Sequence, residues 1–236
     1  MNIVSHNSYK LISENGNSCC VHVMHVKICD IDRRAKEMID TILNTSWINK
    51  LSVVDQISYS ARAERTINKL VNDIFMKVSS PVSTEFGEYM ISMSAQDALK
   101  ESACHKVVPL AEMFKERMSG NSGFDFHTET PTSYLAFGEA KYSGRSTPYE
   151  KALVQISDFI TLKKDEAELI DLKHFCSKKA VDRVTIGEKA FIAAFSLNVK
   201  NIDKLFARIL AIDEVAKLLI YPELYLIGVE VCDCES

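Results

Sequence analysis

Residues Gly123 to Phe159 read GFDFHTETPTSYLAFGEAKYSGRSTPYEKALVQISDF and combine two strand patterns with a helix pattern. Asp125 stands in one alternating strand pattern, and a second runs from Tyr134 to Tyr142 with Glu139 and Lys141. Side chains alternate along a strand, so Glu139 and Lys141 project to one face. If the two strands pair as a hairpin, Asp125 joins that face. Two carboxylates and an amine would then suit a divalent cation beside a phosphate.

The order of these residues resembles that of the PD-(D/E)xK nuclease superfamily. Its members carry an acid on one strand, D/E-x-K on the next strand, and often a helix with glutamine and an aromatic residue four positions later. Asp125, Glu139 with Lys141, and Gln155 with Phe159 stand at those positions. Two departures are visible: no proline directly precedes Asp125, and Phe159 replaces the usual tyrosine.

The resemblance implies hydrolysis of phosphodiesters with Mg²⁺, or Mn²⁺ in its place. The implied metal ligands on the two strands are Asp125, Glu139 and the carbonyl of Ala140, whose neighbours both face the site. An early helix of this fold often adds another acid. By position this acid is Glu88, with Glu85 as the alternate, although acids are also favoured at a helix start for the helix dipole alone.

Lys141 would orient the attacking water or help to deprotonate it, and would offset phosphate charge. Gln155 would hydrogen-bond near Lys141 or the DNA backbone, with a plain helix-surface glutamine as the equal alternative. His127 is interpreted as a structural histidine rather than a site residue. Glu129 shares its face but is a weak ligand candidate, and Arg145 could bind a phosphate.

The runs GNSGFDFHTE and YLAFGEAKYS, followed by the helix with Gln155, are similar to the nuclease subunit of Hachiman-type bacterial anti-phage systems, commonly called HamA. That family implies a partner, a large superfamily-2 helicase (HamB-like) that restrains the nuclease until it meets aberrant DNA. The expected function is therefore metal-dependent DNA cleavage in phage defence.

Three alternatives remain open from the residues. The chain could be a non-catalytic subunit that binds a helicase or nucleic acid on the same fold, although intact Asp125, Glu139 and Lys141 speak against it. A stand-alone restriction-type endonuclease would need a target-recognition domain, and none is visible. The E-x-K triplet could also be accidental in a general α/β domain, in which case Asp125 and Glu139 would lie far apart.

Composition describes an ordinary globular chain of 236 residues, 47% hydrophobic and 25% charged. Its net charge is −4, which argues against a strong autonomous grip on nucleic acid. No apolar run approaches the roughly 18 residues of a membrane span. Because residues 1–18 are too polar for a signal peptide, we expect a cytoplasmic protein without membrane contact.

Seven cysteines are present, an odd number, and none form a C-x-x-C pair. Cys19 and Cys20 lie near His22 and His25, which invites a metal interpretation. An alternating strand is the favoured explanation of that run. We therefore expect reduced, mostly structural thiols.

The expected fold class is α/β, a restriction-endonuclease-like mixed sheet flanked by helices. Residues 1–83 would form an N-terminal strand–helix elaboration packed on a nuclease-like core, 84–236, in one compact unit. Residues 1–18 are expected to be loose or edge-like. Strands are predicted at 20–29, 107–108, 124–126, 134–142, 190–197 and 221–231, and helices at 32–43, 60–77, 86–102, 147–162 and 201–219.

Several local signals refine these elements. Asp30 or Asp32 could cap the helix at 32–43, and Pro81 ends the helix at 60–77. Thr147 is the expected cap of its helix, with Pro148 in the first turn. Residues 119–123 are a turn cluster. Lysines and an arginine between 163 and 183 make that region locally basic, for which solvated surface is favoured over DNA contact.

Overall fold

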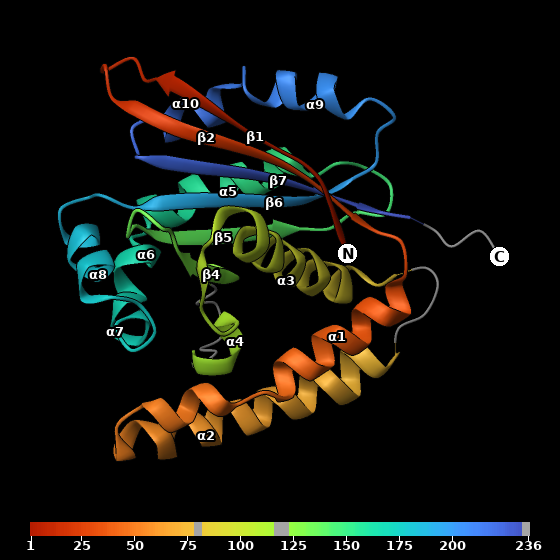
Figure 1. The fold of residues 1–236 in the computed structure, drawn as a ribbon, viewed down its shortest axis with the longest axis vertical. Coiled ribbons are helices and arrows are strands. Elements are labelled where there is room, and N and C mark those ends of the chain that lie inside the picture. Colours follow the sequence, from red (N-terminus) through yellow and green to blue (C-terminus); the bar gives the residue numbers. More distant parts are fainter. Residues whose placement is uncertain (78–81, 116–122, 233–236) are drawn as a thin grey trace.

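The computed structural model describes residues 1–77, 82–115 and 123–232 of the chain. Its centre is a seven-stranded mixed sheet with the strand order β1-β2-β7-β6-β5-β4-β3 (Figure 1). The strands are β1 (Asn2–Ile12), β2 (Ser18–Ile28), β3 (Lys106–Val107), β4 (Phe126–Glu129), β5 (Leu135–Lys141), β6 (Ala190–Leu197) and β7 (Glu223–Val231).

Helices cover both faces of the sheet (Figure 1). They are α1 (Ile31–Leu43), α2 (Val53–Asn68), α3 (Thr84–Ala103), α4 (Ala111–Phe114), α5 (Tyr149–Thr161), α6 (Lys164–Ala167), α7 (Leu169–Leu172), α8 (Lys178–Thr185), α9 (Ile202–Ile209) and α10 (Asp213–Leu218). Helix α3 lies against one face, with α1 and α2 outside it, while α5, α9 and α10 lie on the other side (Figure 1). The predicted α/β class, a mixed sheet flanked by helices, is confirmed.

Strands β5, β6, β7 and β2 run parallel to their neighbours in the sheet centre. Every residue of β6, AFIAAFSL, is buried. A strand covered by helices on both faces needs apolar side chains on both, which explains this unbroken apolar run. By contrast, β1 lies at the edge of the sheet, where it pairs with β2, and its residues are mostly exposed.

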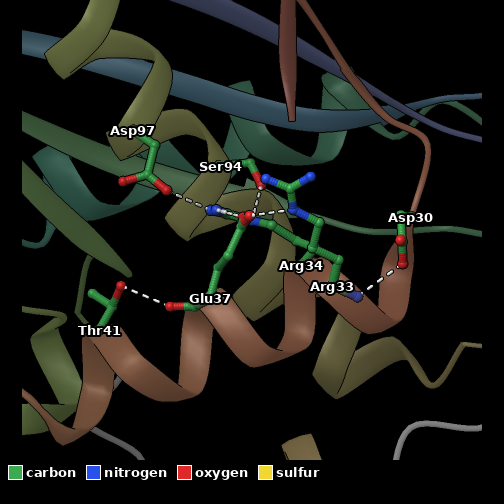
Figure 2. A network of polar contacts seen from close by, with 7 residues as sticks. All are labelled: Asp30, Arg33, Arg34, Glu37, Thr41, Ser94 and Asp97. Carbon is green, nitrogen blue, oxygen red and sulfur yellow. Dashed lines mark hydrogen bonds and ion pairs between the residues drawn. The ribbon is translucent and has the colours of Figure 1, made fainter.

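One buried arginine joins the outer helix α1 to α3. The Arg34 side chain is 5% exposed, and its guanidinium donates to the Ser94 hydroxyl at 3.1 Å and to the Asp97 carboxylate at 2.7 Å. Figure 2 shows both acceptors on α3, with Glu37 of α1 beside them. A buried charge needs such partners, so this network holds α1 on α3.

Three helix starts differ from the predictions by two residues or more, and one of them is that of α3, which begins at Thr84 rather than Phe86. Helix α2 begins at Val53, because the Ser52 hydroxyl accepts a hydrogen bond from the Asp55 backbone N–H at 3.3 Å and caps it there. The Thr147 hydroxyl does not cap α5. It accepts from the Asn198 backbone N–H at 2.9 Å, and Pro148 occupies the cap position. For α1, the cap is Asp30.

The predicted helix at 201–219 is two helices, α9 and α10, separated at residues 210–212. Both segments bury their apolar positions, Leu205 and Ile209 in α9 and Val215 and Leu218 in α10. The apolar pattern was therefore right, but it could not show the bend. Pro81, residues 119–122 of the turn cluster, and Cys234 lie outside the described residues.

The sheet crosses the expected boundary at residue 83. Strand β2 pairs in parallel with β7 along nine residue pairs, from Cys20 with Glu223 to Ile28 with Val231. Buried residues from both sides of the boundary form one hydrophobic cluster. The N-terminal strands are therefore part of the same sheet as the strands of residues 84–236.

Candidate active site

The hairpin of β4 and β5 places Asp125 beside the E-x-K strand. Phe126 pairs with Gly138, where a Cβ would lie only 2.4 Å from the Phe126 ring, so glycine allows this close approach. The Asp125 backbone N–H donates to the Gly138 carbonyl at 2.9 Å, and its carboxylate accepts from the Ala140 N–H at 2.9 Å. The predicted pairing is confirmed, and Asp125 lies next to Glu139 rather than far from it.

Glu139 and Lys141 project to the same face, as strand alternation predicts. The Lys141 ammonium donates to Glu139 Oε1 at 2.7 Å. The Glu139 side chain is fully buried, and its other oxygen, Oε2, has no hydrogen-bond partner among the described residues. A buried carboxylate oxygen normally accepts at least one hydrogen bond, so the lack of one at Glu139 Oε2 calls for an explanation.

Glu88 approaches the same lysine from helix α3. Its carboxylate lies 3.9 Å from the Lys141 ammonium. Gly87, next to it, packs so close to the Tyr142 ring that a Cβ would lie 2.2 Å away. Glu85 is exposed and pairs instead with Lys69 at 3.6 Å. Of the two predicted acids, the structure brings Glu88 to Lys141.

The carboxylates of the site hold their protons more tightly than usual. Burial raises the pKa of Asp125 to about 7, and the charge of Glu112 adds to this shift. Burial and the charge of Asp125 raise the pKa of Glu139 well above its ordinary value. Burial also raises the pKa of Glu88. Such shifts arise where acids crowd together away from water, a common property of functional sites.

The pKa of Lys141 is raised in the metal-free chain. Burial alone would lower its pKa, but the charge and hydrogen bond of Glu139, helped by Asp125 and Glu88, raise it. In the metal-free chain, Lys141 therefore stays protonated and positively charged at neutral pH. Its chemistry favours offsetting negative charge rather than accepting a proton.

Glu112 is a site neighbour that the sequence did not suggest. It lies on the short helix α4, where the Tyr89 hydroxyl donates to its carboxylate at 3.3 Å. Its charge is the second cause of the raised pKa of Asp125. No definite strand or helix was predicted at α4 from the sequence, so an acid there carried no signal of proximity to Asp125.

The structure shows where Ala140 and Gln155 lie, but it does not test the roles predicted for them. The Ala140 N–H holds Asp125, while its carbonyl as a ligand stays a prediction. Gln155 is half-buried on α5, which packs on β5 and β6. No hydrogen bond joins it to Lys141 in the described part of the chain.

His127 is a structural histidine, as interpreted from the sequence. Its Nε2 lies 2.6 Å from Glu168 Oε2, and burial lowers its pKa. The other Glu168 oxygen accepts from the Lys115 ammonium at 2.6 Å and from the Phe124 backbone N–H at 2.9 Å. Glu168, unremarked in the sequence, thus anchors the chain just before Asp125.

Glu129 and Arg145 also lie outside the cluster. The Glu129 carboxylate accepts from the Ser177 backbone N–H at 2.8 Å and so supports the start of α8. Arg145 is exposed in the loop after β5. In the basic region, Lys178 lies 2.5 Å from Asp182, and Lys163 lies 3.6 Å from Glu166.

Few side chains are available at this site to bind a metal ion. Within the described residues, no group of three or more His, Cys, Asp or Glu side chains is arranged as a metal site. Two adjacent carboxylates remain, Asp125 and Glu139, and one of their oxygens is buried and without a hydrogen-bond partner in that part of the chain. Hard cations such as Mg²⁺ use one or two protein carboxylates and complete their shell with water and phosphate oxygens. This pair meets that need.

In comparisons with known proteins, no protein-family model, no curated protein and no solved structure matches the chain. The functional interpretation of the site rests on its residues and geometry. In residues 1–77, 82–115 and 123–232, no helix has the length and apolar character to cross a membrane.

Proposed function

We propose that the chain is a Mg²⁺-dependent deoxyribonuclease of the PD-(D/E)xK type. Apart from the inserted helices α4, α6, α7 and α8, the element order from α3 to β6 is that of the superfamily core, which supports a restriction-endonuclease-like fold. The observation that carries the proposal is the buried Glu139 Oε2, unpartnered among the described residues and beside Asp125 and Lys141. A bound cation would supply the missing partner.

Each residue has a separate role in this proposal. Asp125 and Glu139 would hold the ion, with the Ala140 carbonyl and Glu88 as the further predicted ligands. When bound, Mg²⁺ would lower the pKa of a water molecule and stabilise charge on the phosphate. Lys141, whose ammonium lies beside Glu139, would offset the charge that develops on the phosphate oxygens. Gln155 stays a prediction for positioning.

The biological setting is also part of the proposal. With a net charge of −4, the chain has little general attraction for DNA. A superfamily-2 helicase partner, as in Hachiman-type defence systems, would supply the grip on DNA and control when cleavage occurs. A non-catalytic subunit that binds such a helicase is the alternative, and the small donor set is the observation that favours it.

Plasmid cleavage tests the proposal. The chain, alone and with a co-purified helicase, is incubated with supercoiled plasmid in Mg²⁺, Mn²⁺ or chelator. Glu139→Gln keeps the size of the side chain but removes its charge, so we expect cleavage to fall by at least about 100-fold. Glu85→Gln, an exposed acid on α3, is the matched control and should cleave normally.

Metal binding is measured separately as the rise in melting temperature on adding Mg²⁺. We expect this rise in the parent chain and in Glu85→Gln, but not in Glu139→Gln. Normal cleavage by Glu139→Gln would refute the site. Absence of both cleavage and the Mg²⁺ effect, with and without the helicase, would instead support the binding-subunit alternative.

A further inference from the structure

One cysteine directly follows each of the neighbouring strands β2 and β7, Cys29 after Ile28 and Cys232 after Val231. The parallel register pairs Ile28 with Val231, and the Cys232 backbone N–H donates to the Ile28 carbonyl at 2.9 Å. Continued by one residue, this register would bring Cys29 opposite Cys232, although both lie just beyond the paired residues of the two strands. Neighbouring strands lie about 4.8 Å apart, within the Cα–Cα range of roughly 4.4–6.8 Å that a disulfide spans.

Their side chains also point to the same face of the sheet. Two residues earlier, Lys27 is paired with Glu230, and its ammonium lies 3.2 Å from that carboxylate. Since side chains alternate, Cys29 and Cys232 share this face with them. Burial raises the pKa of Cys232, Lys27 opposes this, and the charge of Cys29 adds to the rise, as expected for neighbouring thiols.

Reagents from solution can reach this pair. Cys29 is exposed and Cys232 is half-buried, at the end of the sheet. Cys19 and Cys176, by comparison, are buried, with 0% and 9% of their surface exposed. Small oxidants therefore meet Cys29 and Cys232 before the buried thiols.

We propose that Cys29 and Cys232 are a thiol pair that forms a reversible intramolecular disulfide by exchange with glutathione disulfide. One thiolate attacks the glutathione disulfide and releases one glutathione, giving a mixed disulfide. The second thiolate then attacks the protein sulfur of that bond and releases the second glutathione. Two protein thiols are oxidised, and one glutathione disulfide is reduced to two glutathione molecules.

The bond would join the two parts of the chain on either side of residue 83. Cys29 directly precedes Asp30, the cap of α1, and Cys232 directly follows β7. The new link would therefore close a loop that contains most of the chain. Closing a long loop stabilises the folded state, because it restricts the unfolded chain more than the folded one.

The test is a titration of the full chain in buffers with increasing ratios of oxidised to reduced glutathione. Non-reducing peptide mapping by mass spectrometry should find the peptides of Cys29 and Cys232 linked to each other. The melting temperature should rise by roughly 5 °C or more on oxidation, and dithiothreitol should reverse it. Cys104→Ser is the matched control, because Cys104 is exposed at the end of α3 and should leave both results unchanged.

Cys29→Ser and Cys232→Ser should each abolish the linked peptides and the stabilisation. Several results would overturn the proposal: both cysteines remaining thiols at the most oxidising ratio, each carrying glutathione as a stable mixed disulfide, or Cys232 pairing with Cys234. Covalent dimers in place of the internal link would overturn it as well. None of these readouts depends on nuclease activity.

Discussion

The neighbouring carboxylates of the candidate site lower the stability of the folded chain at neutral pH. Asp125 has a pKa raised to about 7, and Glu139, fully buried beside it, has a pKa raised well above its ordinary value. Among the residues that the structure describes, Lys141 is the cation that offsets their charge, through its contact with Glu139. Functional sites often retain such strain because the same charges serve binding or catalysis.

This arrangement predicts how stability depends on pH in the metal-free chain. Because the folded-state pKa of Asp125 is about 7, the folded chain holds a proton that the unfolded chain has released above about pH 4. The stabilising contribution is thus complete below about pH 4 and is lost as pH rises through about 7. The loss should amount to roughly 1–4 kcal/mol for this group.

Asp125→Asn isolates this effect. The asparagine carbonyl can still accept from the Ala140 N–H, but it does not ionise. With chelator present, the variant should gain stability over the parent between pH 5 and pH 8, measured by urea unfolding. Equal pH profiles of the two chains would contradict the raised pKa of Asp125.

At the scale of residues, the sequence could predict contacts between residues that lie close together along the chain. Asp125, Glu139 and Lys141 come together because strand alternation and one hairpin are enough to place them. Glu112 and Glu168 act on the same stretch from elements that are distant or irregular in sequence, so no spacing rule points to them. The raised pKa of Lys141 also follows from three-dimensional crowding rather than from its neighbours in sequence.

At the scale of elements, helix α3 must lie very close to the end of β5. Gly87→Ala would place a Cβ 2.2 Å from the Tyr142 ring, so the helix or the ring must move, at a cost of roughly 1–3 kcal/mol. The shift would also move Glu88 away from Lys141. Thermal or urea unfolding measures the loss of stability.

Two further variants distinguish this clash from a general effect of adding a methyl group. Gly144→Ala should be nearly neutral, because a Cβ there would lie 3.7 Å from the Tyr142 hydroxyl. Adding Tyr142→Ala to Gly87→Ala should cause less damage than the two single losses added together, because the clash disappears. Strict additivity would show that the glycine is not needed for the close approach.

The outer layer depends on the contacts of one arginine. Arg34→Ala removes the donors to Ser94 and Asp97 that hold α1 on α3 (Figure 2), so we expect a loss of roughly 2–3 kcal/mol in urea unfolding. Arg33→Ala is the matched control, since Arg33 is exposed and should cost under about 0.5 kcal/mol. Equal effects would mean that burial of Arg34 contributes nothing.

Helices and strands could be predicted because each buries apolar side chains at its own spacing along the chain. Bends and caps were less predictable. The separation of α9 from α10 leaves the apolar spacing nearly unchanged, so the pattern of residues 201–219 fits one helix as well as two. Thr147 carries the right side chain for a cap, but its hydroxyl accepts from Asn198, a contact that only the folded chain creates.

For the molecule as a whole, the sheet makes residues 1–83 and 84–236 depend on each other. Strand β7 lies between β6 and β2, and its first seven residues are buried. Without β2, this apolar strand would become an open edge, and such edges promote aggregation. The helices α1 and α2 would be lost at the same time, which would uncover the outer side of α3.

We therefore expect residues 84–236 alone to lack a cooperative thermal transition and to aggregate, as judged by circular dichroism and light scattering. Deleting only residues 1–16 is the matched control. It removes the mostly exposed edge strand β1 but leaves β2 on β7, so this shorter chain should fold with reduced stability. A cooperative transition in residues 84–236 would instead mean that the nuclease-like part folds independently and that the N-terminal strands are only added to its edge.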